Sequence, residues 1–367
     1  MTGVYISFPF CAQKCTYCNF ASGVFPQHLI GPYIESLRAE IQGAVFPSEP
    51  DTLYLGGGTP SLLEPPQLRA ILEVLPVRLW REATIEAAPG TITAGKAAGW
   101  ASLGINRVSL GVQSFVPEVA HAAGRRHKPE QVAAEIALLA CEGISNINID
   151  LISGLAHETA ETWETSLGWL EQLFPQHVSV YMLEVDDESR LGGELRSGGQ
   201  RFGASCVPSE DDIARFYLQA IERLRKISVV QYEISNFARP GCESIHNLKY
   251  WNMQPYLGFG ADAHSFDGAK RWSNVESPSG YVERMRLGHG VCEIEEWNPV
   301  RRLQEKFFTG LRQTAGIQVA EPEILPFRHS IESLTGRGWL VWTPEGRLQL
   351  TPQGLMFSNE VFEHFIE

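Results

Sequence analysis

The first half of the chain alternates short apolar runs with longer segments in which apolar residues recur at helical spacing. This alternation is typical of βα units that assemble into a parallel sheet. The short runs predict six strands, at Val4–Phe8, Thr52–Leu55, Ala83–Ala87, Arg107–Gly111, Asn146–Leu151 and His177–Met182. The longer segments predict helices between these strands, at Pro32–Gln42, Pro65–Leu75, Thr93–Leu103, Pro129–Glu142 and Ala160–Leu173.

Six strand–helix steps are too few for a closed eight-stranded barrel, so an incomplete (β/α)6 barrel and a doubly wound sheet both fit the pattern. Polar or glycine-rich chemistry follows each strand, which favours the barrel, because barrel sites are built from the C-terminal strand ends. The groups are three cysteines after Phe8, Gly56–Pro60, Glu86, Gln113, Asp150, and Tyr181 with Glu184. Each is weak evidence alone, since an aspartate such as Asp150 also caps helices.

The second half of the chain predicts a smaller unit. A stretch rich in glycine, serine and charge, Asp186–Pro208, is expected to be a loop, either a lid or a disordered excursion. Helical patterns from Glu295 lead to two strands around a turn at Thr343–Gly346, and this order resembles a winged helix. The predicted organisation is a barrel over residues 1–230, a connecting segment over 231–294, and an α+β, winged-helix-like domain over 295–367.

Three cysteines, Cys11, Cys15 and Cys18, form a C-x3-C-x2-C motif directly after the first predicted strand. Three thiolates can hold three irons of a [4Fe–4S] cluster, which normally takes four cysteines. The fourth iron then has an open position, where we expect S-adenosylmethionine to bind. The alternatives are a zinc site or a disulfide loop, but the chain lacks a second cysteine pair at finger-like spacing, which would support zinc.

Charge and composition narrow the class of protein. The net charge is −13, from 30 basic and 43 acidic residues, which argues against a nucleic-acid backbone as the main partner. The chain has no run of eighteen apolar residues and no signal-peptide pattern before Val4, so a cytoplasmic protein is expected. The other four cysteines are scattered, and we expect them to be buried apolar residues in a reducing compartment: Cys141, Cys206, Cys242 and Cys292.

Two further motifs suggest ligands. The glycines of Gly56–Thr59 let the backbone approach a ligand closely and are neither a P-loop nor a dinucleotide fingerprint. They are predicted to hold the amino and carboxylate groups of a methionine moiety, with a tight βα turn as the alternative. His246, beside Asn, Tyr and Trp residues, suits a flat apolar ligand with one axial nitrogen. From the residues alone, a hydrogen-bonded core histidine is favoured there.

With these pieces placed, nearly the whole chain resembles the radical-SAM proteins of the coproporphyrinogen-oxidase-like group, and within that group the heme-chaperone branch. Tyr17 lies inside the cysteine motif, and the remaining motifs carry the resemblance. They are GGGTPS at Gly56–Ser61, GVQSF at Gly111–Phe115, GRRH at Gly124–His127, NIDL at Asn148–Leu151, YEISNFARPG at Tyr232–Gly241, HNLKYW at His246–Trp251 and YLGFG at Tyr256–Gly260.

The resemblance implies a role for each matched residue. Cys11, Cys15 and Cys18 would bind the cluster, and His246 would bind heme. The residues that would contact S-adenosylmethionine are Tyr5, Tyr17, Gly57, Gly58, Thr59, Glu86, Gln113, Arg125 and Asp150, with Glu184 as a further contact whose flanking sequence differs. Three positions depart from the family pattern without removing a ligand: Asn19, Ala88 and Ala156.

Two activities share these motifs. The oxygen-independent oxidases of the group decarboxylate coproporphyrinogen III to protoporphyrinogen IX and have a fourth cysteine two residues past the third. Here that residue is Phe20, and the first strand begins early, at Val4, without the oxidases' long N-terminal segment. The resemblance therefore implies a heme chaperone that delivers heme to acceptor hemoproteins such as respiratory enzymes, with a homodimer left open and the oxidase as the alternative.

Overall fold

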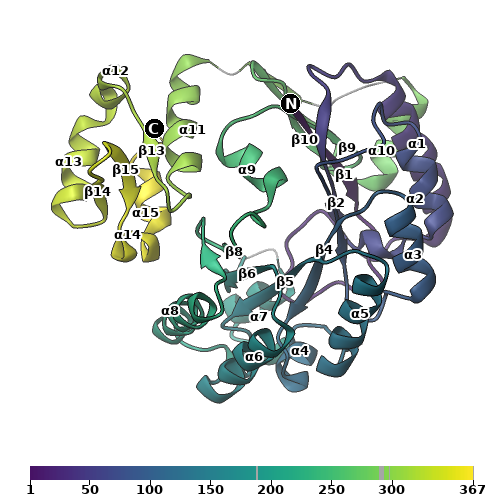
Figure 1. The fold of residues 1–367 in the computed structure, drawn as a ribbon, viewed down its shortest axis with the longest axis horizontal. Helices are drawn as coiled ribbons and strands as arrows, with labels where there is room; N and C mark the ends of the chain where they lie inside the picture. The colour runs from purple at the N-terminus through teal and green to yellow at the C-terminus, as the bar shows by residue number, and fades with distance from the viewer. Residues whose placement is uncertain (187–188, 289–292, 297, 367) are drawn as a thin grey trace.

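The computed structural model describes residues 1–186, 189–288, 293–296 and 298–366, and a twisted parallel sheet forms its centre (Figure 1). Six parallel strands pair in chain order: β1 (Thr2–Phe8), β2 (Pro50–Gly57), β3 (Glu82–Ala87), β4 (Arg107–Gln113), β5 (Asn146–Ser153) and β6 (His177–Met182). All six agree with the predicted strands. Their order, in which each strand pairs with the next, is that of a barrel and not of a doubly wound sheet.

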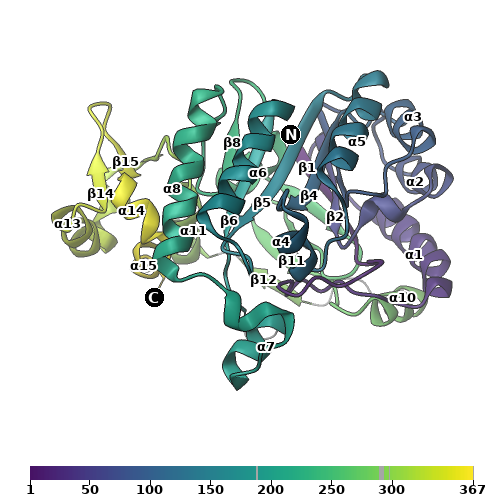
Figure 2. The same ribbon diagram turned by 90° about the horizontal axis from the view of Figure 1, so that it is seen from below.

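Helices cover the convex face of this sheet (Figures 1 and 2). They are α1 (Ile30–Gly43), α2 (Pro65–Leu72), α3 (Ala94–Ser102), α5 (Pro129–Cys141), α6 (Ala160–Leu173) and α8 (Glu210–Lys226). The first five match the predicted helices to within one turn. Ser209 caps α8, because its hydroxyl accepts the N–H of Asp212. The short α4 (Pro117–Ala122) was not predicted, since six residues show too little periodicity.

The strands are apolar on one face and polar on the other. Val4, Ile6, Leu53 and Leu55 are fully buried, as expected of side chains packed beneath the helices. The alternate positions face the inside of the barrel, where the register aligns Tyr5 with Tyr54 and Thr84. The same positions on β4 to β6 are also polar: Arg107, Ser109, Asn148, Asp150, His177 and Ser179. The barrel interior is therefore filled by polar side chains, many of them buried, and not by an apolar core.

The segment 231–294 extends this sheet at both edges. β9 (Tyr256–Phe259) pairs parallel with β1 and is followed outward by β10 (His264–Phe266), β11 (Lys270–Ser273) and β12 (Glu293–Glu296). On the other side β8 (Asn236–Ala238) pairs antiparallel with β6, and β7 (Val230–Gln231) is the edge strand. Because β7 and β12 do not pair with each other, the barrel is open, as the incomplete (β/α)6 architecture predicts. α10 (Pro278–Arg286) packs beside α1.

A short helix and the C-terminal unit occupy the opening of the arc (Figure 1). The short helix is α9 (Ile245–Trp251). The C-terminal unit has a three-stranded antiparallel sheet and a core that includes Phe307, Phe327 and Phe365. Its elements are α11 (Pro299–Gly310), β13 (Ile317–Gln318), α12 (Glu321–Ile324), α13 (Arg328–Gly336), β14 (Leu340–Trp342), β15 (Arg347–Leu350), α14 (Pro352–Met356) and α15 (Ser358–Glu363). The predicted strand pair around Thr343–Gly346 is confirmed, and the winged-helix classification stays a prediction.

Two expectations were wrong. Asp186–Pro208 is not simply a loop, because α7 (Arg190–Ser197) and a 3-10 segment at Arg201–Cys206 lie within it. Ser189 caps α7. The helix was not predicted because its glycines weaken the helical pattern. The scattered cysteines are not buried, since Cys141 and Cys206 are exposed and Cys242 is half-buried, and Cys292 lies outside the described residues.

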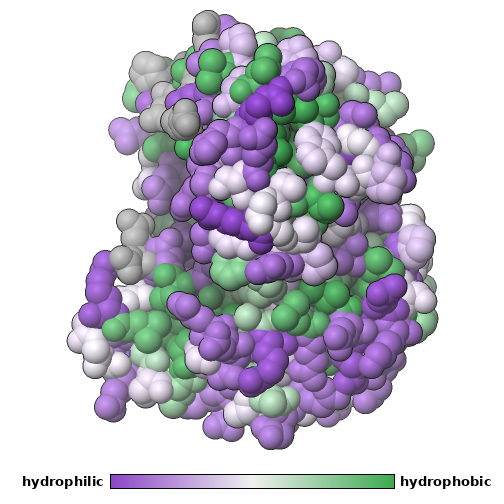
Figure 3. Space-filling view, turned by 90° about the vertical axis from the view of Figure 1, so that its left-hand side faces the viewer, coloured by the Kyte–Doolittle hydropathy of each residue, from purple (hydrophilic) through white to green (hydrophobic). Residues whose placement is uncertain are grey.

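The surface on the side of the C-terminal unit is largely hydrophilic, with smaller hydrophobic patches between (Figure 3). Among the described residues, no helix is both long enough and apolar enough to cross a bilayer.

One buried carboxyl group predicts how stability depends on pH. Glu158 is 5% exposed and accepts the N–H of Gly154 at 2.5 Å, and burial raises its pKa from 4.5 to about 8. The folded state therefore holds the proton more tightly, so this contribution to stability is complete below pH 4.5 and is lost as the pH rises to 8. Between about pH 5.5 and 8, wild type should lose roughly 3 kcal/mol of unfolding free energy relative to Glu158→Gln.

Urea unfolding at the two pH values measures this difference. Glu161→Gln is the matched control, because Glu161 is an exposed carboxylate three residues away. If the unfolding free energies of wild type and Glu158→Gln changed equally with pH, ionisation of Glu158 would not destabilise the folded state.

Candidate functional site

The three cysteines lie on a loop that leaves the C-terminal end of β1. The loop is closed at its base, where the N–H of Cys11 donates to the Gly23 carbonyl at 2.8 Å. Its middle is tied to α4, because the Thr16 hydroxyl donates to the Ala122 carbonyl at 3.1 Å. The N–H of Leu191 in α7 donates to the Thr16 carbonyl at 2.8 Å. The loop is thus held from three sides while all three thiols remain partly exposed.

The donor set fits a cubane cluster. The three cysteines are free thiols, so they do not form the alternative disulfide loop. Among the described residues, no three His, Cys, Asp or Glu side chains converge on a point where one metal ion could bind. A zinc site needs such convergence, whereas each cysteine of a [4Fe–4S] cluster binds its own iron. Burial raises the pKa of the Cys11 thiol, and hydrogen bonds from Thr59 and Ser22 oppose that shift.

The glycine turn packs directly against the root of the cysteine loop. Gly57 has φ +101°, a backbone conformation that favours glycine. A Cβ at Gly58 would lie 2.7 Å from the carbonyl carbon of Pro9, closer than packed atoms allow. The N–H groups of Gly58 and Thr59 donate to the carbonyls of Phe8 and Phe10, at 2.9 and 3.0 Å. These contacts match the tight-turn alternative, and they place the turn beside Cys11.

Two carboxyl groups inside the barrel, on β3 and β5, are close enough for the charge of one to act on the other. Glu86 accepts the Tyr54 hydroxyl at 3.0 Å, and burial followed by the charge of Asp150 raises the pKa of Glu86 to about 7. Asp150 accepts the Ser109 hydroxyl at 3.0 Å and the Asn148 amide at 2.7 Å, yet burial still raises its pKa. A carboxyl group whose pKa is raised by a neighbouring carboxylate favours a bound cation, and S-adenosylmethionine carries a sulfonium and an ammonium group.

Arg125 connects this pair to the cysteine loop. It follows α4, and its electrostatic partners are Tyr17, Cys15 and Asp150, which together raise its pKa despite the opposing effect of burial. Burial also raises the pKa of Tyr17, against the charge of Arg125. The Arg125 Nε atom is buried without a hydrogen-bond partner among the described residues. An unsatisfied buried donor of this kind fits an anionic ligand group such as a carboxylate.

The remaining predicted S-adenosylmethionine contacts differ in whether they lie near Glu86, Asp150 and Arg125. Gln113 ends β4 at a bulge with φ 67°, a left-handed conformation that is uncommon for glutamine and marks functional or strained sites. The Tyr5 ring stacks on Tyr54, with centroids 6.1 Å apart. Glu184 lies two residues past β6 and is exposed, so the structure does not bring it into the buried group.

Tyr54 is the residue that sequence reasoning missed. Its hydroxyl binds Glu86, and its ring lies against both Tyr5 and His246, at centroid distances of 6.1 and 5.4 Å. The available signal was strand alternation, which places Tyr54 on the same face as Gly56. Tyr54 was not singled out because it lies inside an apolar run, where a tyrosine is expected to be a core residue.

His246 lies at the opposite end of the barrel. Its α9 helix packs against the N-terminal ends of β1 to β3, where the Glu82 carboxylate accepts the N–H groups of Ile245 and His246 at 2.8 and 2.9 Å. The cysteines lie beyond the C-terminal end of β1, so one strand length, roughly 20 Å, separates the two motifs.

The imidazole of His246 is fully buried and fully engaged. Nδ1 pairs with the Thr52 hydroxyl at 3.0 Å and Nε2 with the Tyr250 hydroxyl at 2.8 Å. Burial, then the charges of Lys249 and Arg107, lower its pKa to about 3, so the ring is neutral. Heme ligation by His246 stays a prediction, and it would require Tyr250 to release Nε2.

Comparison with known proteins agrees with this geometry. The sequence model of the radical SAM superfamily matches residues 5–170. A protein named heme chaperone HemW from Synechocystis sp. is 33% identical, over 98% of this chain and 95% of its own length. A protein of the same name from Escherichia coli is 32% identical, over 99% of this chain and 97% of its own length. The chain belongs to the HemW family.

The fold of this HemW-family chain also has a solved counterpart. The coproporphyrinogen III oxidase HemN from Escherichia coli, a radical SAM enzyme, superposes with a TM-score of 0.85 at 21% identity, covering 99% of this chain and 89% of that chain. This likeness confirms the incomplete radical-SAM barrel. Membership of the superfamily implies the [4Fe–4S] cluster and S-adenosylmethionine.

Proposed function

We propose that this HemW-family protein binds heme and delivers it to acceptor hemoproteins, while a [4Fe–4S] cluster and S-adenosylmethionine occupy the C-terminal end of the barrel. The family match over nearly the full length supports the chaperone function. The observation that separates it from the oxidase is Phe20. Its side chain is 67% exposed beside the cysteine loop, at the position where the oxidases have a fourth cysteine.

Within that site we assign the cluster to Cys11, Cys15 and Cys18. Three residues of the barrel interior support the S-adenosylmethionine contacts. The carboxylates of Glu86 and Asp150 suit its positive groups, and Arg125 has a free donor for its carboxylate. The proposed contacts nearer the cysteines are Tyr5, Tyr17, Gly57, Gly58, Thr59 and Gln113, with Glu184 only at the exposed rim. These residues would bind and orient the ligand, and a reduced cluster would supply an electron for chemistry at the sulfonium.

An anaerobic assay with two substrates tests the function. The reconstituted protein should shift the Soret band of added hemin and should produce no decarboxylated porphyrin from coproporphyrinogen III with S-adenosylmethionine and a reductant. The reason is that Phe20 occupies the position of the oxidases' fourth cysteine and has no thiol. An authentic coproporphyrinogen III oxidase serves as the positive control. Protoporphyrin detected by fluorescence after oxidation would assign the protein to the oxidases instead.

Respiratory enzymes as acceptors, a homodimer and a cytoplasmic location remain predictions. They rest on the family resemblance and on the free thiols, which suit a reducing compartment.

A further inference from the structure

The imidazole of His246 is covered by a residue of its own helix. Its Nδ1 faces Thr52 on β2, and its Nε2 pairs with the hydroxyl of Tyr250, which lies one turn later in α9. An iron atom can therefore reach Nε2 only when the last turn of α9, which carries Tyr250, moves away from the first turn. What holds that last turn in place thus decides whether His246 can bind heme.

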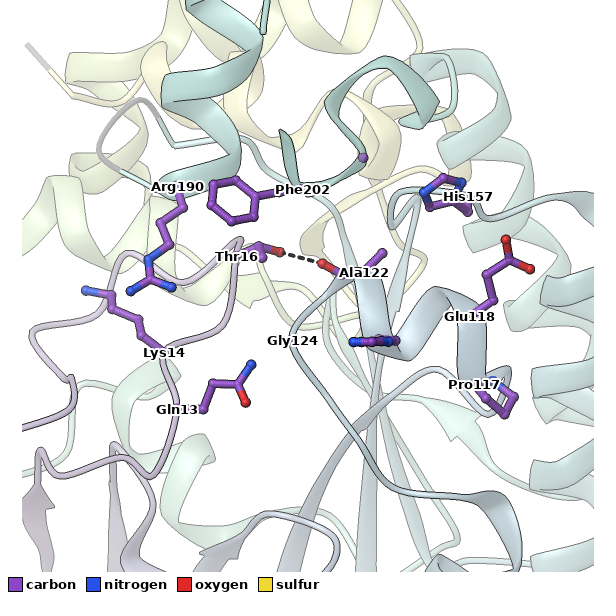
Figure 4. A pocket seen from close by; sticks show the side chains of 12 residues that line it. Gln13, Lys14, Thr16, Pro117, Glu118, Ala122, Gly124, His157, Arg190 and Phe202 are labelled. Carbon is purple, nitrogen blue, oxygen red and sulfur yellow. Dashed lines mark hydrogen bonds between the residues drawn. The ribbon is translucent and has the colours of Figure 1, made fainter. Parts of the chain in front are cut away.

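A large open pocket lies elsewhere and gives no access to this nitrogen. It has a volume of about 670 Å³, adjoins the cysteine loop and includes His157 and Phe202 in its lining (Figure 4). Figure 4 also shows the hydrogen bond from Thr16 to Ala122 beside it. This pocket is at the C-terminal end of the strands, one strand length from His246. Access to His246 therefore depends on the contacts of α9.

The first turn of α9 is fixed to the barrel. The Glu82 carboxylate accepts the Ser244 hydroxyl at 3.3 Å and the N–H of His246 at 2.9 Å. Farther along the helix, the ammonium group of Lys249 lies 2.8 Å from the Asp51 carboxylate, and both side chains are largely buried. Because these contacts join α9 to β2 and β3, the turn that carries His246 is the less able of the two to move.

The last turn of α9 is held by the C-terminal unit. The guanidinium of Arg312, just beyond α11, lies over the Trp251 ring, 4.5 Å from its centroid. The next residue, Gln313, donates to the side-chain oxygen of Asn252 at 3.3 Å, and Asn252 in turn donates to the Leu248 carbonyl at 2.8 Å. Helix ends open more readily than helix centres. These two contacts therefore oppose the opening of the turn next to Tyr250.

The contact between Arg312 and Trp251 is incompletely satisfied. Arg312 Nη2 is 3.7 Å from the fully buried carboxylate of Glu233, which is too far for a hydrogen bond. Among the described residues, Nε of Arg312 and Nε1 of Trp251 are buried and have no hydrogen-bond partner. Buried donors without partners cost free energy. The closed arrangement is thus less stable than a fully bonded one, so it can open without a large loss of hydrogen bonding.

We propose that Arg312 is a positioning residue for the heme ligand, which holds the last turn of α9 closed so that Tyr250 covers Nε2 of His246 until the C-terminal unit releases Trp251. The inference rests on the proposed function and on heme ligation by His246. It gives the C-terminal unit a part in heme transfer, because its contact with α9 sets how often the ligand is available. After heme leaves, the same closure would prevent it from rebinding.

Stopped-flow mixing of hemin with the cluster-reconstituted full chain tests this role. Arg312→Ala is made in the Glu233→Gln background, so that no buried carboxylate loses its partner, and Glu233→Gln alone is the reference. The association rate and the affinity should both rise by about threefold to tenfold, because a larger fraction of the molecules is open. The dissociation rate and the final Soret spectrum should not change. A general structural defect would instead lower the affinity.

Four further variants make the test specific. Arg312→Lys should keep the slow association, because an ammonium group also binds the face of an indole ring. Arg337→Ala is the matched control, since Arg337 also lies over a tryptophan, Trp339, but within the C-terminal unit, and it should bind hemin like wild type. His246→Ala should lose tight hemin binding, with or without Arg312→Ala.

Trp251→Leu removes the other half of the contact and keeps the test decisive should the Arg312 variant fail to fold. It should accelerate hemin binding as Arg312→Ala does. The two substitutions together should give no further acceleration, because both act through one contact. Cluster absorbance should be the same in every variant, since the cysteines lie at the other end of the barrel.

The outcomes distinguish this role from the function. A wild-type protein that fails to bind hemin would overturn the chaperone function itself. If wild type binds hemin but Arg312→Ala and Trp251→Leu leave its association rate unchanged, the function stands and the role of Arg312 is wrong. Weaker binding by Arg312→Ala would mean that Arg312 contacts the bound heme, and normal binding by His246→Ala would place the ligand elsewhere. Either result would overturn this inference.

Discussion

Cys18→Ala should abolish the iron–sulfur cluster while the barrel remains folded. The three thiols lie on one loop, and each would bind a separate iron, so the loss of one leaves two irons without protein ligands. Loss of an outer partner alone typically costs 10–100-fold in metal affinity, so loss of a direct ligand should cost at least about that much. Anaerobic reconstitution followed by iron and sulfide analysis measures the change, together with the visible absorbance of the cluster.

Cys242→Ala is the matched control, because Cys242 is also a half-buried free thiol but lies far along the chain from the loop. It should reconstitute like wild type. Circular dichroism of Cys18→Ala should show an unchanged fold, since the loop is held by hydrogen bonds of Cys11 and Thr16. Full cluster content in Cys18→Ala would mean that the three cysteines are not the ligand set.

Gly58→Ala should destabilise the protein and disturb the cysteine loop together. The added Cβ would lie 2.7 Å from the Pro9 carbonyl carbon and 2.9 Å from the carbonyl oxygens of Phe8 and Phe10. All three are backbone atoms, so relief requires β1 and β2 to separate where the loop begins. Forcing extra volume into a packed site costs about 1–3 kcal/mol, and rigid backbone neighbours place this case at the upper end.

Gly168→Ala is the control for the same chemical change. Gly168 lies inside α6, and a Cβ there would meet nothing within 4 Å. Alanine should stabilise that helix by about 0.5–1 kcal/mol. Thermal unfolding and cluster content are measured for both variants. Equal stability of Gly58→Ala and wild type would show that the turn tolerates a side chain, and would weaken the packing account of the glycine run.

These two experiments concern one end of the barrel, and the arrangement of the other end limits what the HNLKYW motif can do. α9 closes the N-terminal ends of β1 to β3, and Gly3 permits its approach, because a Cβ at Gly3 would lie 3.2 Å from the His246 ring. Lys249 adds a buried ion pair with Asp51 at 2.8 Å. Packing of α9 against the barrel therefore accounts for the burial of His246 and Lys249 in the HNLKYW motif, whether or not α9 also binds a ligand.

Much of the architecture was predictable because it depends on local patterns. Alternation of apolar and polar residues, together with helical periodicity, predicted all six parallel strands and five of the outer helices. Three cysteines within eight residues predicted a cluster site for the same reason, since one loop brings them together whatever the rest of the chain does. α7 was missed, because glycines at positions 192 and 193 weaken helical propensity and its Ser189 cap supplies the missing support.

The sequence by itself determined the strands, the cysteine loop and the family motifs, because each of these is a contiguous pattern. Only the tertiary structure decided which motifs share a site. Parallel strands place residues that lie far apart in sequence, such as Glu86 and Asp150, at one end, and place Cys11 and His246 at opposite ends. It alone showed that both nitrogens of His246 are occupied and that His157 faces a pocket. These facts depend on long-range contacts and on the direction of each side chain, which no local pattern encodes.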